Sequence, residues 1–335
     1  MSMSRDNLIS TYPFPMVIDN TMREDWWKCH HYFFRRHIHG IRPTVLDENL
    51  EPTTSKSIDL VFGGVLAKGI EVTRKSYANG EGKGDSIVLG ASALVKAWME
   101  EEPLPPPMSR GQEAKTLDNA LMCHAGYWTE WPLDDPMQQV ASINGKAMIE
   151  FSGACPIPNC YHPITGEQLL YAGRFDSVLD RFGVLFGLDD KSTGSRVDSE
   201  IWRNQWRLRG QFTGYCWLAQ SYDIPMNAFL IHGIQVQKTQ CKFAEALAER
   251  PQWMISQWLA QLETDIINMI ADYHAFINNP HSQRSHPFGQ ALGYACKQYN
   301  RTCEYMNDIC ASPRPDYDRF AVTRWNPLER TEDAT

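Results

Sequence analysis

The chain has 335 residues, enough to bury one large core or two modest ones, and its 43% hydrophobic content with 11 tryptophans indicates a folded, soluble protein. No apolar run approaches the roughly 20 residues that span a membrane. The 32 lysines and arginines against 40 aspartates and glutamates leave a net charge of −8, which argues against a protein that coats duplex nucleic acid. Residues 1–12 are polar and include Arg5, unlike a signal peptide, so we expect a cytoplasmic protein.

The predicted elements form a helical front followed by strands and further helices. Hydrophobic periodicity predicts helices at 16–38, 85–102 and 112–127, strands at 138–153, 169–180 and 184–191, a helix at 199–220, a strand at 227–237 and a helix at 251–276. This order predicts an α/β fold. We expect a single compact unit over 1–335, with a helical N-terminal region at 16–135, an α/β core at 136–280 and a cysteine-bearing C-terminal tail at 281–335.

A strand hairpin is predicted between residues 171 and 194, because two apolar, strand-prone pieces flank the loop 180–183. If Arg181 and Phe182 form the centre of the loop, the numbers of facing residues sum to 363. Asp176 then lies opposite Gly187, and Asp189 lies opposite Arg174.

Side chains alternate between the two faces of a strand, so this register places Asp176, Asp189 and Lys191 on one face. A loop one residue longer or shorter would place Asp190 there instead. Carboxylates from opposite strands can share a Mg²⁺ or Mn²⁺ ion, and a nearby ammonium polarises water and stabilises charge on a phosphate. The alternative interpretation is an exposed hairpin with scattered charges.

The predicted helix at 199–220 carries Arg203, Arg207, Gln211 and Tyr215 at intervals of four, which places them along one ridge. Such a ridge can hold a nucleic-acid backbone, with the arginines on phosphates and Gln211 on water or a ligand. A solvated helix face is the alternative.

The order Gly173-x-x-Asp176, Asp189-x-Lys191 and Gln211-x-x-x-Tyr215 resembles the RecB-like branch of the PD-(D/E)xK nuclease superfamily, which includes CRISPR-associated and phage-encoded exonucleases. The resemblance implies a restriction-endonuclease-like core, a central mixed sheet flanked by helices. In that core Asp176 and Asp189 bind the metal and Lys191 serves catalysis. It also implies that Gln211 and Tyr215 support the site. Glu150 resembles the glutamate of the strand that enters this core and is a third candidate metal ligand.

One position departs from the family pattern. Residues 62–71 are similar to the family's amino-terminal helix motif, in which a histidine occupies the position of Ala67. Alanine cannot bind a metal, so the resemblance implies that this ligand comes from Glu71, from Glu150 or from water.

Nine cysteines in a cytoplasmic chain favour metal binding over disulfides. Cys296, Cys303 and Cys310 recur at intervals of seven, which also suits one side of a helix. With Cys29, this trio resembles the signature of iron-sulfur members of the same family. The resemblance implies a 4Fe-4S cluster that links the two ends of the chain, and a structural zinc ion is the second candidate cofactor.

The other cysteines receive structural interpretations. Cys123, Cys216 and Cys241 suit buried small hydrophobic positions. The segment 155–160, with a cysteine at each end, suits a rigid loop between strands, and zinc binding is the alternative.

We therefore predict a metal-dependent deoxyribonuclease, by resemblance an exonuclease acting on single strands or duplex ends. If the chain is phage-encoded, it would act in the host cytoplasm, in DNA recombination or repair and with a recombination or replication partner protein. The alternative is a non-catalytic nucleic-acid-binding or recombination accessory protein that retains the nuclease fold.

Overall fold

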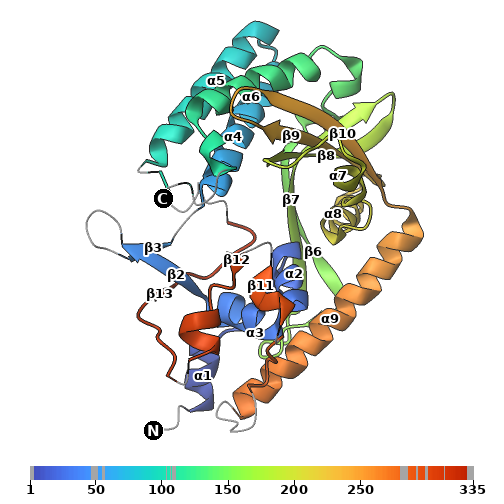
Figure 1. Cartoon of the computed structure of the whole chain (residues 1–335). Coiled ribbons are helices and arrows are strands. Elements are labelled where there is room, and N and C mark those ends of the chain that lie inside the picture. The colour runs from blue at the N-terminus through green and yellow to red at the C-terminus, as the bar shows by residue number, and fades with distance from the viewer. Residues whose placement is uncertain are drawn as a thin grey trace. The chain divides into compact units, whose positions relative to one another are not determined.

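The computed structural model describes residues 4–46, 52–54, 57–102, 104–105, 107, 111–279, 286–291, 293–298, 301–312 and 314–329 (Figure 1). The chain forms two compact units, each described by itself below. Unit 1 comprises Met1–Ser55, Gly153–Gly173 and Ser256–Thr335, and unit 2 comprises Lys56–Ser152 and Arg174–Ile255. The expected single compact unit, with divisions after residues 135 and 280, stays a prediction.

The largest sheet has six strands and mixed directions, which confirms the predicted α/β class. Its strands are β1 (Val17–Ile18), β6 (Ile149–Tyr161), β7 (Gln168–Arg181), β8 (Val184–Thr193), β9 (Ala228–Val236) and β10 (Cys241–Glu249). The order is β1-β7-β8-β9-β10, with β6 also paired to β7. The β7–β8 and β9–β10 pairs are antiparallel, and the β8–β9 pair is parallel.

Helices cover both faces of the unit 2 sheet (Figure 1). These are α4 (Ile58–Ala78), α5 (Lys83–Glu100) and α6 (Leu117–Glu130) on one face, and α7 (Glu200–Asn204) and α8 (Gly210–Gln220) on the other. The alternation of β9 explains the arrangement, because His232 contacts α6 through Tyr127 while its neighbour Gly233 lies against Trp202 of α7. The Ser57 side chain caps the first turn of α4 by accepting from the Leu60 N–H.

Unit 1 contains β1 and parts of β6 and β7 besides its helices and small sheets. It contains α1 (Arg5–Thr11), α2 (Asn20–Lys28), α3 (His30–Phe33), a π-helical turn at Phe34–Ile38 and most of α9 (Gln252–Asn278). Small sheets are formed by β2 (Ile41–Leu46), β3 (Pro52–Thr54) and β13 (Phe320–Val322), and by β11 (Lys297–Gln298) and β12 (Arg301–Thr302). A buried ion pair of 2.7 Å joins Arg23 of α2 to Asp265 of α9, with the guanidinium over the rings of Trp27 and Trp258.

Three predicted elements differ from the structure. The helix expected at 16–38 is interrupted at Cys29, which has an extended backbone. The strand expected at 138–153 is replaced by two short strands, β4 (Ser142–Ile143) and β5 (Lys146–Ala147), before β6 begins at Ile149. The third difference, in the helix expected at 199–220, bears on the site and is described with it. Within the described residues, every helix is too short or too polar to cross a membrane.

Candidate functional site

The predicted hairpin is present, but its turn lies one residue later than expected. Phe182 and Gly183 both have positive φ, 57° and 84°, and reverse the chain in two residues. The Gly183 N–H donates to Asp180 Oδ1 at 2.6 Å. Arg181 therefore pairs with Val184 and Val178 with Gly187, so that facing residues sum to 365.

The expected opposition of Asp176 to Gly187 is therefore wrong, as is that of Asp189 to Arg174. The predicted register is wrong by two residues, and an even shift leaves each side chain on the same face of its strand. Asp176, Asp189 and Lys191 therefore share one face, as expected. Ser177 and Leu188 form the last pair of this β7–β8 ladder. Their neighbours Asp176 and Asp189 lie just beyond the paired part of the two strands.

Two carboxylates and one ammonium meet at the end of this ladder. Lys191 Nζ lies 2.5 Å from Asp189 Oδ2, and the Asp189 side chain is only 4% exposed. Asp176 Oδ2 accepts the backbone N–H of Asp190 at 2.6 Å, which links the two strands where the ladder stops.

The charges of this group are strongly coupled. Burial, followed by the charges of Asp189 and Asp190, raises the pKa of Asp176 well above its usual range. Burial also raises the pKa of Asp189, although Lys191 opposes the shift. Burial disfavours the ammonium of Lys191, but Asp189 and Asp176 outweigh this and raise its pKa. The two carboxylates thus favour the charged form of Lys191.

Glu150 of β6 belongs to the same electrostatic group, because its charge contributes to the raised pKa of Asp176. Its carboxylate lies 3.0 Å from Arg174 Nε, and its side chain is almost fully buried. Among the described residues, no three histidine, cysteine, aspartate or glutamate side chains converge closely enough to hold one metal ion. Lys191 and Arg174 instead neutralise Asp189 and Glu150.

Gln211 and Tyr215 of α8 reach the site as predicted for their spacing of four. Gln211 Nε2 donates to the Tyr215 hydroxyl at 2.9 Å. Burial and then the charge of Asp189 raise the pKa of Tyr215. The Tyr215 ring also lies 5.5 Å from that of Phe175, the neighbour of Asp176. The structure thus brings together all six predicted site residues, directly or through one neighbour.

The helix expected at 199–220 is two helices, so the predicted ridge of arginines is not continuous. Residues 205–209 separate α7 from α8. The buried guanidinium of Arg250 donates to the carbonyls of Trp206 and Arg209 at 2.9 and 3.1 Å, and to Thr213 Oγ1 at 2.7 Å. These bonds satisfy carbonyls that a continuous helix would have used internally, which explains the break.

Ala67 of α4 lies beside the candidate site. It lines a cavity of about 280 Å³ together with Asp190 and Lys191. Glu71, the substitute ligand suggested by sequence, forms ion pairs with Lys75 and, at 3.5 Å, with Lys68.

A buried network lies on the opposite face of β8 and was not predicted. Asp190 accepts from Arg74 at 2.8 Å and from the Tyr127 hydroxyl at 2.8 Å. The same hydroxyl accepts from Arg74 and lies 2.7 Å from His232 Nδ1. His232 Nε2 in turn lies 3.2 Å from Glu245 Oε2.

Burial opposes ionisation of Asp190, but Arg74 and His232 outweigh it and lower its pKa. Glu245 is further paired with Arg181 at 2.6 Å. Strand alternation alone could have indicated that Asp190 faces away from Asp189. Its partners Arg74 and Tyr127 come from helices far away in the sequence.

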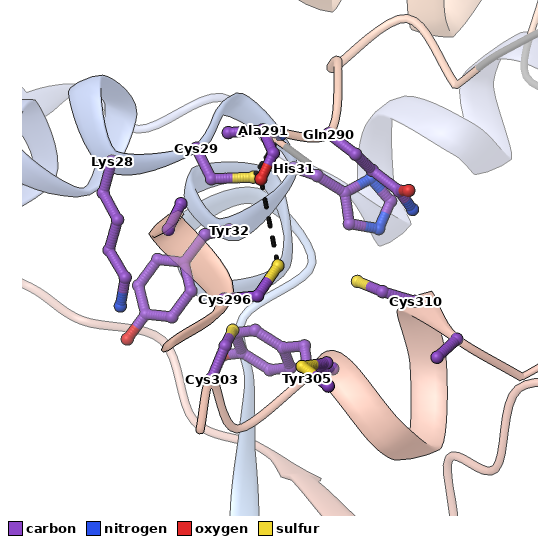
Figure 2. Close-up of a pocket in the computed structure, with 13 residues that line it drawn as sticks. Lys28, Cys29, His31, Tyr32, Gln290, Ala291, Cys296, Cys303, Tyr305 and Cys310 are labelled. Atoms are coloured by element: carbon purple, nitrogen blue, oxygen red, sulfur yellow. Dashed lines mark hydrogen bonds between the residues drawn. The ribbon is translucent and has the colours of Figure 1, made fainter. Parts of the chain in front are cut away.

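The four cysteines predicted to hold a cluster line one cavity of about 260 Å³ in unit 1 (Figure 2). Cys29 Sγ accepts the Ala291 N–H at 3.3 Å, and Cys296 Sγ lies 3.8 Å from the Ala291 carbonyl. Burial raises the pKa of the Cys303 thiol and raises that of Cys310 to about 11. Cys29 therefore lies around the same cavity as the three cysteines that come more than 260 residues later.

The trio does not lie on one helix, so the alternative of a helix interface is wrong. Cys296 ends a 3₁₀ turn, Cys303 follows β12, and Cys310 ends a π-helical turn. A tetrahedral zinc would require sulfurs about 3.8 Å apart, given Zn–S bonds of about 2.3 Å. No group of three cysteines in the described residues is that compact.

Two predictions for the other cysteines are wrong. Cys123 of α6 and Cys241 of β10 form a disulfide and are not separate free thiols. Residues 155–160 lie inside β6 and not in a loop, with Cys155 and Cys160 both buried. Cys216 is buried and free, as predicted.

Comparison with known proteins does not identify a family. No protein-family model matches the sequence, and neither does any curated protein. The chain has a weak similarity to a solved structure described as "Crystal structure of SSO0001", with 12% sequence identity and a TM-score of 0.28. The similarity covers 66% of this chain and 81% of that chain. A TM-score this low does not establish a common fold.

Proposed function

We propose that this chain is a divalent-metal-dependent deoxyribonuclease with a restriction-endonuclease-like core of the RecB-like PD-(D/E)xK branch. The observation that carries the proposal is the meeting of Asp176 and Asp189, from adjacent strands, with the ammonium of Lys191. Buried carboxylates with raised pKa values and a specific charge partner are typical of functional sites. DNA strand ends are the proposed substrate, by analogy with the exonucleases that the motifs resemble.

Asp176 and Asp189 would hold Mg²⁺ or Mn²⁺, with Glu150 beside them, and the ion would neutralise charge on the scissile phosphate. Burial and the neighbouring carboxylates make ionisation of Asp176 unfavourable and raise its pKa, and a cation held beside it would offset this cost. The Lys191 ammonium stabilises the negative charge that develops on the phosphate. The Gln211–Tyr215 pair positions a hydroxyl beside Asp189 and Lys191.

The cysteine-lined cavity supports an iron-sulfur cluster held by Cys29, Cys296, Cys303 and Cys310. Such a cluster would tie residues near the two ends of unit 1 together. It would contribute folding free energy and not hydrolysis.

A non-catalytic nucleic-acid-binding protein is the second candidate. Ala67 beside the site supports it, because this position offers no ligand. The internal pairing of Asp189 with Lys191 and of Glu150 with Arg174 supports it as well, because it leaves no carboxylate charge uncompensated on those two residues.

The test compares wild-type protein, Lys191→Ala and a control, Lys96→Ala, on end-labelled single-stranded and duplex DNA with Mg²⁺, Mn²⁺ or chelator. Lys96 is 79% exposed on α5 and pairs with Glu100, so its removal takes away a similar charge outside the site. We expect metal-dependent cleavage by the wild type and the control, and a loss of at least about 100-fold in Lys191→Ala. DNA binding in chelator should persist.

Cleavage retained by Lys191→Ala would contradict the catalytic assignment. DNA binding by the wild type without cleavage under any metal condition would instead favour the second candidate.

A further inference from the structure

Helix α7 and the connection to α8 present two aliphatic side chains to solvent, Ile201 on the helix and Leu208 in the connection. We call residues 200–209 the platform. Ile201 and Leu208 are 85% and 81% exposed, although each would gain free energy if it were covered. Isolated exposed aliphatic residues are common, so the charges around them decide what the surface can bind.

Three exposed arginines occupy the same ten residues: Arg203, Arg207 and Arg209. In the described part of the chain, neither Arg203 nor Arg207 has a carboxylate partner, whereas the nearby Arg196 pairs with Asp198 at 2.5 Å. The platform carries one acidic residue, Glu200, which accepts from Asn204 at 3.3 Å. A net positive surface on a chain of net charge −8 is complementary to a polyanion.

Buried side chains fix the backbone of the platform. Trp202 and Trp206 are buried, and Trp202 lies so close to Gly233 that a Cβ there would meet its ring at 2.3 Å. Arg250 fixes the carbonyls of Trp206 and Arg209. A rigid surface loses little conformational entropy when it binds a ligand.

The platform also borders the candidate site. Arg209 immediately precedes α8, which begins at Gly210 and carries Gln211 and Tyr215. The charge of Arg209 reaches Asp189, whose pKa it helps to lower against burial. A strand lying on the platform would therefore pass close to the carboxylates.

We propose that the platform binds the unpaired end of a DNA strand, with Arg203 and Arg207 on phosphates and with Ile201 and Leu208 packed against bases. This inference rests on the proposed nuclease function and assigns the surface that holds the unpaired part of its substrate. Arginine–phosphate contacts supply salt-dependent affinity, and apolar contacts with base faces are largely insensitive to both sequence and salt.

The experiment measures fluorescence anisotropy of a labelled oligothymidylate, a blunt duplex and a duplex with a frayed end, in chelator and over a range of salt concentrations. The full-length wild type is compared with Arg203→Ala/Arg207→Ala and with Ile201→Ser/Leu208→Ser. The control is Arg196→Ala/Lys96→Ala, which removes two exposed charges outside the platform. Thermal melting verifies that all variants are folded.

We expect the arginine variant to reduce the slope of log affinity against log salt on single strands by about 1.4, or about 0.7 for each phosphate contact. The aliphatic variant should weaken binding to single-stranded and frayed DNA about tenfold without changing that slope. A slope change no larger than that of the control, or unchanged affinity of the aliphatic variant, would overturn the inference.

The cleavage and binding experiments test the two proposals independently. Cleavage by the wild type together with unaltered binding by the platform variants would refute the platform alone. Absence of cleavage together with the expected slope change would refute the nuclease and leave the platform as a DNA-binding surface.

Discussion

Replacing Tyr127 with phenylalanine removes one oxygen from the buried network behind the candidate site. The ring stays, packed 4.8 Å from the rings of Trp128 and Trp131, so no cavity larger than a hydroxyl forms. The lost hydroxyl is the one that contacts Asp190, Arg74 and His232.

The partners of the hydroxyl determine how much free energy of unfolding the Tyr127→Phe variant loses. Arg74 keeps Asp190 through both terminal nitrogens, at 2.8 and 3.4 Å, so the loss falls on Asp190 and His232. Asp190 keeps Arg74 and His232 keeps Glu245 at 3.2 Å, so each loses one contact and neither becomes isolated. At about 1–2 kcal/mol for each buried polar group that loses a partner, we expect a loss of about 2–4 kcal/mol in the free energy of unfolding. With an unfolding entropy of about 2.1 cal/mol/K per residue, Tm should fall by about 3–6 °C.

Denaturant unfolding of Tyr127→Phe, with Tyr161→Phe as control, measures this loss. Tyr161 is 55% exposed on β6, so its hydroxyl is solvated and the control should change by less than about 0.5 kcal/mol. Since the Asp190 N–H donates to Asp176, we also expect Tyr127→Phe to require several times more Mn²⁺ for half-maximal cleavage. A stability change as small as that of the control would refute the energetic role of the network.

Three further predictions concern pH, the cysteine cavity and the disulfide. Burial lowers the pKa of His31 to about 3 and those of His39 and His286 to about 4, so these residues are neutral when folded and take up protons on unfolding below pH 6.5. The free energy of unfolding should therefore fall as pH drops from 6.5 toward 4, and His286→Asn should flatten that fall in a series of melting curves; a profile that rises toward pH 4 would contradict this. Anaerobic purification should give a brown protein containing iron and sulfide, lost in Cys29→Ser but kept in Cys216→Ser, whereas a colourless protein with stoichiometric zinc would overturn the iron-sulfur assignment. Reduction of the Cys123–Cys241 disulfide, which spans a sequence separation of 118, should lower the free energy of unfolding by about 2–5 kcal/mol, and equal stability with and without reductant would show that the link contributes nothing.

The prediction that three charged residues of the hairpin share one face was correct although the predicted register was wrong. The expected register was wrong, because Phe182 takes a left-handed conformation that is unusual for a residue other than glycine. The shift of two residues left the face of Asp176, Asp189 and Lys191 unchanged. Alternation in a strand depends only on parity, so it tolerates an even error in register.

The break between α7 and α8 shows the opposite case. The apolar pattern of 199–220 suits a single helix, and no residue in it is a proline. Arg250, about forty positions later, supplies the hydrogen bonds that stabilise the break. A local pattern does not contain this interaction, because tertiary contacts override helix propensity.

By itself, then, the sequence determined the α/β class, the shared face of the two aspartates and the lysine, and the group of four cysteines. The first two rest on hydrophobic periodicity and strand alternation, which are local properties of the chain, and the group of cysteines rests on the family resemblance. Only the tertiary structure decided the hairpin register, the Arg74–Asp190–Tyr127–His232 network, the disulfide and the rigid platform. Each of these depends on side chains from distant segments, whose contacts form when the core packs and cannot be read from spacing alone.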